Sequence, residues 1–482
     1  MRSIQRSGES TAVCGSVMCA SRNRLMQDIL RITCALVLLL SLVSPRIGVA
    51  EPQDTSASPK YPRYRLVDFG SLGGGSSGSF GTSKQLNNRG EALAQSETTI
   101  PDPYAPADCT DCFVWHGVVM EDNGVVTDLG SLPGRNSSVP VGISESGLIA
   151  GFSQYGVIDP STGFVPWQAV LWNRDRSIVA LGTFGGNCST AYSVNSRGQV
   201  VGMALNTIPE NPDFVFSINI DCQAATQARA FVWQNGSMLD LGTLGGNDAS
   251  AMEVNEGGEV VGVSYTNTLP SDTVGVPTIH PFLWKNGAMT DLGSLGGTVA
   301  VPGSLLLGAT RVLNDSGEVA GTSFVAGDGV QHAFLWSNGH MIDLGTLGGS
   351  KSDASALNNK TQVVGSARVS DTPLLRHAFL WEKGHMTDLG AVAPCRQSQA
   401  FSINAASQII GNSYDCAGTF DEIAFYAEKG KPMVDLNTLI DPPSPIHIDS
   451  PWTINERGEI FASGFLPDGT TRAVELVPLP GH

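Results

Sequence analysis

Histidines provide the first spacing in this chain that suggests chemistry. His332, His340, His377 and His385 occupy matching places in two similar phrases, "HAFLWSNGHMIDLGTLGG" and "HAFLWEKGHMTDLG". Four imidazoles along one edge of two adjacent structural elements would suit a metal ion. No cysteine or paired carboxylate accompanies them, so we favour a role in hydrogen bonding.

An aspartate recurs before a Leu-Gly pair or a close variant of it. In one of the eight copies, Ala180 stands in its place. The other seven copies carry Asp68, Asp128, Asp240, Asp291, Asp343, Asp388 and Asp435. Carboxylates suit calcium, but a calcium loop needs several oxygen ligands close in sequence. The phrase "DLGTLGG" supplies one carboxylate among glycines and leucines. This pattern favours a side chain that caps the backbone N–H groups of its own turn.

Glycines and tryptophans recur with the aspartates. The glycines lack the Lys-Ser/Thr or Rossmann spacing of a phosphate-binding loop, and sharp turns between strands explain them. Six tryptophans share one repeat position: Trp115, Trp172, Trp233, Trp284, Trp336 and Trp381. Indole rings stack on sugars, but the Phe two residues earlier shares the same strand face, which favours a buried wedge. No Ser-His-Asp, Gly-x-Ser-x-Gly or His-Glu-x-x-His pattern is present, so we assign no catalytic, cofactor-binding or metal-binding residue.

Three repeated signatures define the elements that carry these residues. The first is the strand that ends in Asp-Leu-Gly, and the second is a hairpin such as "VNSRGQVVG" from Val194. The third is an aromatic strand such as "AFLW" from Ala333, which often leads through an Asn-Gly turn into the next Asp-Leu-Gly strand. Asn-Gly and Asn-x-x-Gly between β-branched runs predict short hairpins. Each repeat therefore contains four short strands.

Four strands per repeat, with almost no helical periodicity, predict an all-β fold. The repeat length fits a β-propeller blade, and a solenoid is the main competitor. Residues of both parities are apolar in "AFLW", as expected when both faces of a sheet are covered. We expect about eight four-stranded blades, with seven as the alternative. The N-terminal segment "RYRLVDFG" from Arg63 would supply the strand that the last blade lacks and so close the ring.

The phrases "HAFLW", "NGHMIDLGTLGG" and "LNNKTQVVG" resemble the HAF repeat of probable extracellular bacterial proteins. The resemblance covers residues 64 to 476. The sequence departs from the repeat pattern in two places: Arg472–Leu476 lacks the Trp, and the phrase "VAPCRQ" stands where Gly-Gly is expected. It implies an exported repeat architecture and carries no established catalytic residue.

The N-terminal segment has the features of a secretory signal peptide. Arginines precede the apolar run "ITCALVLLLSLV", and small residues precede Glu51. We therefore expect a signal peptide over residues 1–50, a linker over 51–62 and a single β-propeller domain over 63–482, with an uncleaved anchor as the alternative. Cleavage removes six arginines and two acids, so the formal charge changes from −17 to −21. This acidity argues against a nucleic acid partner.

Six cysteines remain after cleavage, an even number that suggests disulfides in an exported chain. Cys188 and Cys395 occupy one repeat position, and Cys222 and Cys416 both fall in the variable loop before an aromatic strand. The Gly-rich link and that loop must emerge on the same face, so we predict the bridges Cys188–Cys222 and Cys395–Cys416. Cys109 and Cys112 would join within their own loop. A redox-active CxxC is the alternative for this pair, although it lacks a helix start that would acidify the thiol.

The copies differ most in the loops of residues 95–112, 153–168, 203–229 and 264–280, which should crowd one face. Such loops are where a propeller would hold a partner. We expect a secreted or periplasmic monomer, not inserted in the membrane after cleavage, that acts as a non-catalytic binding or scaffold module for a protein or glycan. A hydrolase or lyase that acts on polysaccharide, with its site at that face or in a central channel, is the alternative.

Overall fold

The computed structural model describes residues 60–79, 84–105, 112–121, 124–134, 137–156, 158–160, 163, 165–210, 222, 226–304, 311–417 and 422–480. The expected signal peptide and most of the expected linker lie outside these residues. The described chain belongs to one compact unit, Pro59–His482. It is made of β-strands, with one 3-10 helix, η2 (Leu436–Leu439), among the labelled elements.

The strands recur in sets of four. The first strands are β2 (Gly73–Gly78), β6 (Ser138–Ile143), β10 (Gly185–Val194), β14 (Ala249–Val254), β18 (Gly296–Pro302), β22 (Ser352–Leu357), β26 (Cys395–Ile403) and β30 (His447–Ile454). The second strands are β3 (Ala92–Pro101), β7 (Ile149–Gln154), β11 (Val200–Pro209), β15 (Val260–Tyr265), β19 (Val319–Val325), β23 (Val363–Asp371), β27 (Gln408–Cys416) and β31 (Ile460–Phe465). The third strands are β4 (Phe113–Met120), β8 (Trp167–Trp172), β12 (Thr226–Gln234), β16 (Ile279–Lys285), β20 (Gln331–Ser337), β24 (Leu374–Glu382), β28 (Glu422–Glu428) and β32 (Thr471–Pro478). The fourth strands are β5 (Val126–Gly130), β9 (Ile178–Ala180), β13 (Ser237–Asp240), β17 (Ala288–Asp291), β21 (His340–Asp343), β25 (His385–Asp388), β29 (Val434–Asp435) and, from the start of the described chain, β1 (Tyr64–Asp68).

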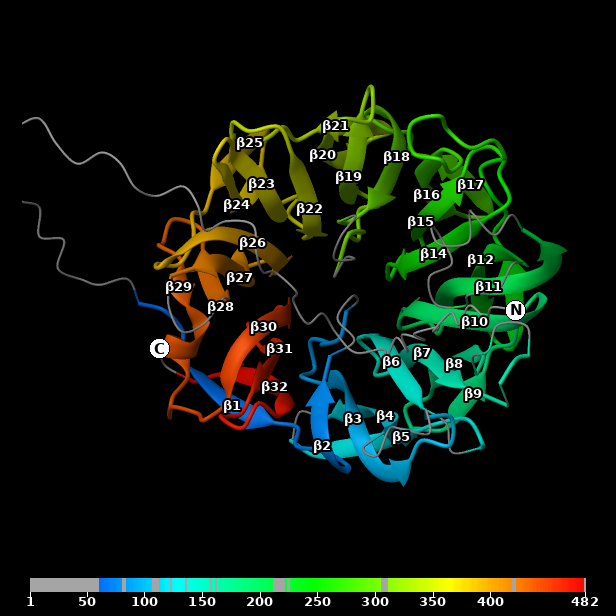
Figure 1. Cartoon of the computed structure of the whole chain (residues 1–482), viewed down its shortest axis with the longest axis horizontal. Helices are drawn as coiled ribbons and strands as arrows, with labels where there is room; N and C mark the ends of the chain where they lie inside the picture. Colours follow the sequence, from blue (N-terminus) through cyan, green and yellow to red (C-terminus); the bar gives the residue numbers. More distant parts are fainter. Residues whose placement is uncertain are drawn as a thin grey trace, which may run out of the picture. The chain divides into compact units, whose positions relative to one another are not determined.

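Each set forms an antiparallel sheet in chain order, so the prediction of an all-β chain of repeated four-stranded sheets is confirmed. Two consecutive sets, β14–β17 and β18–β21, are joined by one parallel pair, Ile279 with Val299, and form an eight-stranded sheet. Consecutive sets pack against each other, and β2 of the first set also packs against β32 of the last. Figure 1 lets the reader follow the sheets in this order, with the first strands β6, β10, β14, β22, β26 and β30 nearest the middle.

A chain of asparagine side chains connects the sheets at the turns between first and second strands. In seven of the eight turns an Asn amide donates to the backbone oxygen of the equivalent residue of the next sheet. The links are Asn87 to Ser144, Asn195 to Asn255, Asn255 to Asn314, Asn314 to Asn358, Asn358 to Asn404, Asn404 to Asn455 and Asn455 to Asn87, at 2.9 to 3.3 Å. Ser144 has no amide to donate, so no such link leads from it to Asn195. The last link joins residues 368 positions apart and ties the final sheet to the first.

The core lies between the sheets, so both faces of the strands are covered. All residues of β6, β15 and β22 are buried. The clusters of buried apolar side chains combine residues of neighbouring sheets, as where Ala320 and Leu335 meet Ala354 and Phe379. This packing explains the apolar runs of both parities, since a sheet covered on both sides has no solvent face on which polar residues would alternate.

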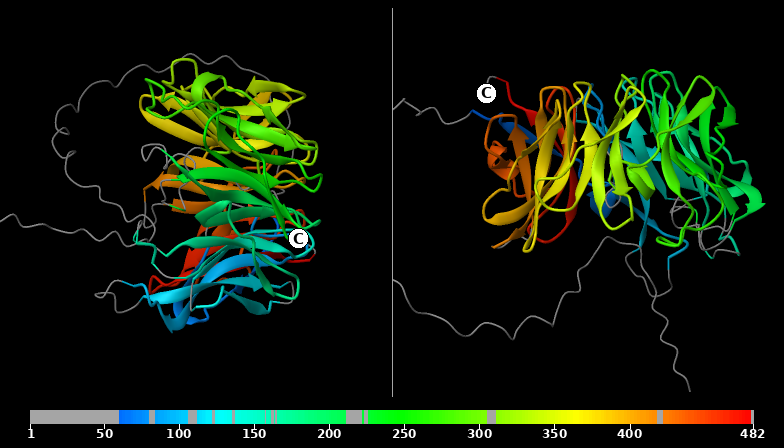
Figure 2. Two further views of the ribbon diagram at one scale, coloured as in Figure 1. Left: turned by 90° about the vertical axis from the view of Figure 1, so that its right-hand side faces the viewer. Right: turned by 90° about the horizontal axis from the view of Figure 1, so that it is seen from above.

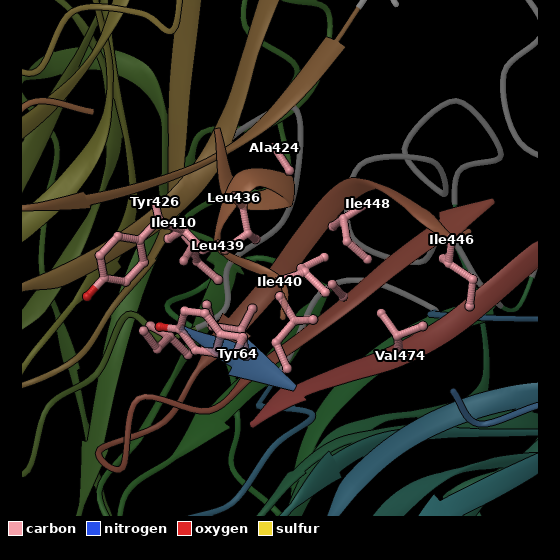
Figure 3. Close-up of a cluster of buried hydrophobic side chains, with 14 residues drawn as sticks. Tyr64, Ile410, Ala424, Tyr426, Leu436, Leu439, Ile440, Ile446, Ile448 and Val474 are labelled. Carbon is pink, nitrogen blue, oxygen red and sulfur yellow. The ribbon is translucent and has the colours of Figure 1, made fainter. Parts of the chain in front are cut away.

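Strand β1 adds the fourth strand to the sheet of β30 to β32, because it pairs antiparallel with β32. Tyr64 of β1 is fully buried among side chains of β28, η2 and β30 to β32, including Tyr426 and Ile440. Figure 3 shows Tyr64 pointing into this cluster, toward the side chains of the orange and red segments. Figure 2 shows from two further sides that the strands of the sheets run between the same two edges of the unit.

Antiparallel order fixes which connections share an edge. Turns from first to second strands, and from third to fourth strands, lie at one edge, which we call the turn face. Connections from second to third strands, and from one sheet to the next, lie at the other edge, which we call the loop face. The variable stretches of the sequence are connections between second and third strands and therefore belong to the loop face. The disulfide prediction assumes that these connections and the Gly-rich links between sheets share one edge.

Candidate functional site

The recurring aspartates cap their own Gly-rich turns. Oδ1 of Asp343 accepts the N–H of Gly345 at 2.8 Å, and the equivalent aspartates do the same. These are Asp68, Asp128, Asp240, Asp291 and Asp388, at 2.7 to 2.8 Å. The carboxylates are therefore used in the turn geometry that the sequence suggests.

The histidines of the third strands pair with these same aspartates. Nδ1 of His332 lies 2.9 Å from Asp343, and His377 lies 2.9 Å from Asp388. The pairs His116–Asp128 and His280–Asp291 repeat the contact, and Arg229 replaces the imidazole beside Asp240. Hydrogen bonds from His377 and from a backbone N–H outweigh the opposing effect of burial and lower the pKa of Asp388. The same hydrogen bond to Asp388 raises the pKa of His377.

A metal site at the four sequence-selected histidines has no support in this geometry. His340 and His385 are exposed at the turn face, whereas His332 and His377 are held by aspartates. In the described ranges, no three His, Cys, Asp or Glu side chains are placed to hold a metal ion.

The repeat tryptophans lie between sheets. Trp233 and Trp381 are buried, and Trp284 and Trp336 are half-buried. Each faces a methionine across the strand pair: Met238, Met386, Met289 and Met341. The wedge interpretation describes this placement better than an open stacking surface.

The first sheet corrects one sequence alignment. Residues 112–115, "CFVW", are not the counterpart of "AFLW", because His116 pairs with Asp128 as His332 pairs with Asp343. The residue after His116, Gly117, donates its N–H to Ser138, as Ala333 does to Ser352. Trp115 therefore lies before the histidine position. Alignment on the Trp gave the wrong register for this strand, and the His–Asp pair gives the correct one.

The structure contains the disulfides Cys188–Cys222 and Cys395–Cys416, the two pairs that the repeat positions predict. They close segments of 34 and 21 residues at the loop face. Cys109 of the third predicted bridge lies outside the described residues. Two disulfides fit an extracytoplasmic location. No helix of the described chain has the length and apolarity needed to cross a membrane.

Large apolar side chains are exposed on the loop face. Most of those on the described surface lie in the connections between second and third strands or at the strand ends beside them: Tyr155, Ile158, Ile208, Leu269 and Leu374. Leu269 is the most exposed, at 74%. Neighbouring loops contact each other here, since the Tyr104 hydroxyl donates to the backbone oxygen of Gly156 at 2.7 Å.

A cluster of polar side chains from three successive sheets also lies at the loop face, and sequence reasoning did not select it. Gln331, Arg376 and Glu422 occupy one position of the third strands, directly before the histidine position. Asp353 and Gln399 occupy one position of the first strands. Elsewhere the third-strand position holds residues such as Trp115, Trp167 and Ile279. The available signal was this change from apolar to polar at matched positions.

Contacts join the two rows into what we call the polar cluster: Gln331, Asp353, Arg376, Asn412, Tyr414 and Glu422. Gln331 donates to Asp353 at 2.5 Å, and Arg376 lies 3.8 Å from the other oxygen of that carboxylate. Asn412 donates to Glu422 at 2.8 Å, and Arg376 hydrogen-bonds to Tyr414. Both rows and the second strand β27 are thus represented.

Burial dominates the electrostatics of the polar cluster. It raises the pKa of Asp353 despite the neighbouring Arg376 and Gln331, and it raises the pKa of Tyr414. Nearby, burial and the Glu422 carboxylate raise the pKa of Asp449 to about 6. The cluster thus offers hydrogen-bond donors and acceptors in a partly dehydrated setting, where they act more strongly than in water.

A second buried acidic group lies between the sheets of β10–β13 and β14–β17. Asp248 follows "LGTLGGN" as Cys188 follows "LGTFGGN", so a carboxyl replaces the disulfide sulfur at that place. One oxygen of Asp248 accepts the N–H of Ala228 at 2.6 Å, and the carboxyl shares a hydrogen bond with Glu210. Burial and then Glu210 raise the pKa of Asp248 to about 7.

Comparisons with known proteins found neither a matching family model nor a matching curated protein. Among solved structures, the β-propeller domain of the Trilobed protease from Pyrococcus furiosus matches 72% of this chain and 96% of its own, with 9% identity and a TM-score of 0.39. Porphyromonas gingivalis dipeptidyl peptidase 4 matches 78% of this chain but 56% of its own, with 12% identity and a TM-score of 0.41. A polysaccharide lyase of family PL25, an ulvan lyase, matches 85% and 95%, with 10% identity and a TM-score of 0.36. At these values the likenesses say nothing about the residues of a site.

Proposed function

We propose that the chain is an eight-bladed β-propeller of HAF-type repeats that acts outside the cytoplasm as a non-catalytic binding or scaffold module. Each set of four strands is one blade, and β1 closes the ring within the last one. Two features support closure: β1 pairs with β32, and the asparagine links lead from Asn455 back to Asn87. The module is a monomer that holds a protein or glycan, and its acidity disfavours nucleic acid.

The exposed apolar side chains of the loop face carry this proposal. Soluble proteins seldom gather large apolar residues at one edge unless a partner covers them. Ile208 lies at the end of β11 and Leu269 follows β15, so both are at this edge of consecutive sheets, where the sequence copies differ most. The recurring Asp side chains cap turns, the His side chains pair with these aspartates, and the Trp side chains pack between sheets. They therefore stabilise the sheets that carry these loops.

The experiment compares two double variants of matched chemistry. Ile208→Glu with Leu269→Glu changes the loop face, whereas Leu239→Glu with Ile342→Glu changes exposed residues of the fourth strands. Each is crosslinked to an envelope fraction, recovered, and also applied to a glycan array. We expect wild type and the fourth-strand variant to retain the same partner, and the loop variant to lose it. Equal retention by both variants would refute the proposal for this face.

A polysaccharide hydrolase or lyase is the second candidate, and the polar cluster is the observation that favours it. Asp353, Arg376 and Tyr414 bring a carboxyl, a guanidinium and a phenol together, and two of them have raised pKa values. Perturbed titratable groups gather at catalytic sites. Turnover of a polysaccharide that disappears in Tyr414→Phe would replace the first proposal with this one.

A further inference from the structure

Three second strands end at the loop face in the same short motif. It reads "TTIP" at 98–101, "NTIP" at 206–209 and "NTLP" at 267–270. In each copy the backbone N–H of the aliphatic residue donates to the side chain two residues earlier. The bonds run from Ile100 to Thr98, from Ile208 to Asn206 and from Leu269 to Asn267, at 2.9 to 3.1 Å. The proline that follows has a fixed φ, so the backbone around the aliphatic residue is restrained on both sides.

The motif places apolar side chains in water. Ile208 is 53% exposed and Leu269 is 74% exposed, whereas Ile100 is half-buried. In the sheet of β6–β9, which lacks the motif, the connection after β7 contributes the exposed Tyr155 and Ile158. The first four sheets thus present large apolar side chains at one edge, the kind of surface that a partner normally covers.

Contacts between neighbouring connections hold these loops in position. The side-chain amide of Asn187 donates to the carboxylate of Asp159, which joins the second and third sheets. Val276 of the fourth sheet packs on the buried cluster that contains the Cys188–Cys222 disulfide of the third. A surface that is ordered before binding loses less conformational entropy when a partner arrives.

The same loops are acidic. In the described parts of the four variable loops, one residue is a lysine or arginine, Arg229, and it already pairs with Asp240 at 3.0 Å. The acidic residues there are Glu97, Asp102, Asp159, Glu210 and Asp272. Of these, Asp272 is exposed and Glu210 is buried. The other described lysines and arginines of the loop face belong to the last three sheets: Lys351, Arg368, Arg376, Arg396 and Arg472. The first four sheets therefore attract positive charge at this edge.

The side chains favour a polypeptide over a glycan. Sugar rings stack on aromatic faces, but Ile158, Ile208 and Leu269 are aliphatic and offer no such face. Aliphatic side chains gain most from contact with other apolar side chains. Lysine and arginine side chains of a polypeptide would in addition complement the carboxylates.

We propose that the loop-face edge of the first four sheets docks a basic polypeptide segment that carries apolar side chains. Ile208 and Leu269 contact its apolar side chains, and Asp102 and Asp272 face its lysines or arginines. This inference rests on the binding function proposed above and names the class of its partner.

The test measures the binding of three synthetic peptides of equal length to the full chain by fluorescence anisotropy. One peptide contains leucine and lysine, one leucine and glutamate, and one serine and lysine. We expect the leucine-lysine peptide to bind most tightly, because it alone combines apolar side chains with positive charge. Its affinity should fall as salt is added, since salt screens exposed charges.

An apolar double variant tests the aliphatic contacts. Ile208→Ser with Leu269→Ser should lower the affinity for the leucine-lysine peptide about tenfold, because two side chains no longer bury apolar surface. The matched control is Leu239→Ser with Ile342→Ser, which changes exposed aliphatic residues of the fourth strands. This control should bind like wild type.

A charge double variant tests the carboxylates. Asp102→Asn with Asp272→Asn should lower the same affinity about fivefold, the size expected for two exposed ion pairs. The matched control is Glu256→Gln with Asp315→Asn, which removes two exposed carboxylates of the turn face. It should bind like wild type, although it changes the net charge by the same amount.

Four results would overturn the inference. They are equal binding of the three peptides, preference for the leucine-glutamate peptide, equal affinity of wild type and both loop-face variants, and no binding of any peptide. The binding function itself is decided separately, by the Ile208→Glu and Leu269→Glu variant on the envelope fraction and the glycan array. If that variant lost a glycan partner, the binding function would stand and the polypeptide would be refuted. Thermal unfolding of each variant shows whether a loss of affinity comes from a loss of folding.

Discussion

Asp248 gives the sharpest test of the electrostatics, because its carboxyl retains a proton in the fold that it would lose in water. The unfolded carboxyl titrates at 3.8, whereas burial and Glu210 raise the pKa in the folded protein to about 7. Between these values, unfolding releases a proton, so stability falls as pH rises and levels off above pH 7. A difference of about three pKa units corresponds to about 4 kcal/mol.

Asp248→Asn should remove this pH dependence. Its amide oxygen can accept the N–H of Ala228, as the carboxyl does at 2.6 Å, and its amide nitrogen can donate to Glu210. We expect the variant to match wild type near pH 4.5, where the folded carboxyl is protonated, and to be about 3 kcal/mol more stable at pH 8. Urea unfolding followed by tryptophan fluorescence at half-unit pH steps measures the difference.

A control with the opposite sign is Asp291→Asn. Hydrogen bonds from His280 and the N–H of Gly293 outweigh burial and lower the pKa of Asp291. Its ionised form therefore stabilises the fold above the unfolded pKa and loses this effect as pH falls, so the substitution should cost stability at neutral pH. If Asp248→Asn and wild type gave parallel curves from pH 4.5 to 8, the assignment of a retained proton to Asp248 would be wrong.

Three further substitutions test the frame by urea unfolding. Asn255→Ala removes hydrogen bonds to Glu259 and to the backbone of Asn314. It should lower the free energy of unfolding by roughly 3 kcal/mol. A loss below about 0.5 kcal/mol would contradict the role of the asparagine chain. His377→Gln should lower the free energy of unfolding by about 0.5 kcal/mol at pH 5.5 and by less at pH 9. The pKa of His377 is raised in the fold, so the charged imidazole stabilises the protein at low pH and this effect is lost as pH rises. A greater cost at pH 9 would contradict the raised pKa of His377. Tyr64→Ala should cost about 3 kcal/mol through the emptied core of β1, whereas the exposed Tyr155→Ala should be near neutral; equal effects would show that β1 contributes little.

Local sequence patterns were sufficient for the strands and most turns, because each depends on neighbouring residues. Asn235-Gly236 takes positive φ values of 52° and 83°, the hairpin geometry that this pair favours. Thr361 and Ser407 show the limit of the pattern. They take positive φ where other copies have glycine, because the fold imposes the turn on residues that disfavour it.

The polar cluster and the Asp248–Glu210 pair were not foreseen, because their residues come from different sheets. Gln331 and Asp353 are 22 residues apart, and neither belongs to a repeated signature. Nothing in the local sequence shows that a carboxyl will be dehydrated by a neighbouring sheet. Trp115 was misassigned because the alignment on Trp did not use the pairing of β4 with β5, in which His116 contacts Asp128.

The sequence by itself determined the repeating unit, its four strands, the capping aspartates and two of the cysteine pairs, because these features occupy positions that recur from copy to copy. Tertiary structure alone decided which non-repeated side chains meet. The loops bring together residues that no period relates, and their chemistry depends on dehydration by strands of other sheets. Asp248 is an ordinary acid in the sequence, and its pKa rises to about 7 only after the sheets have packed. The same burial raises the pKa of Asp353.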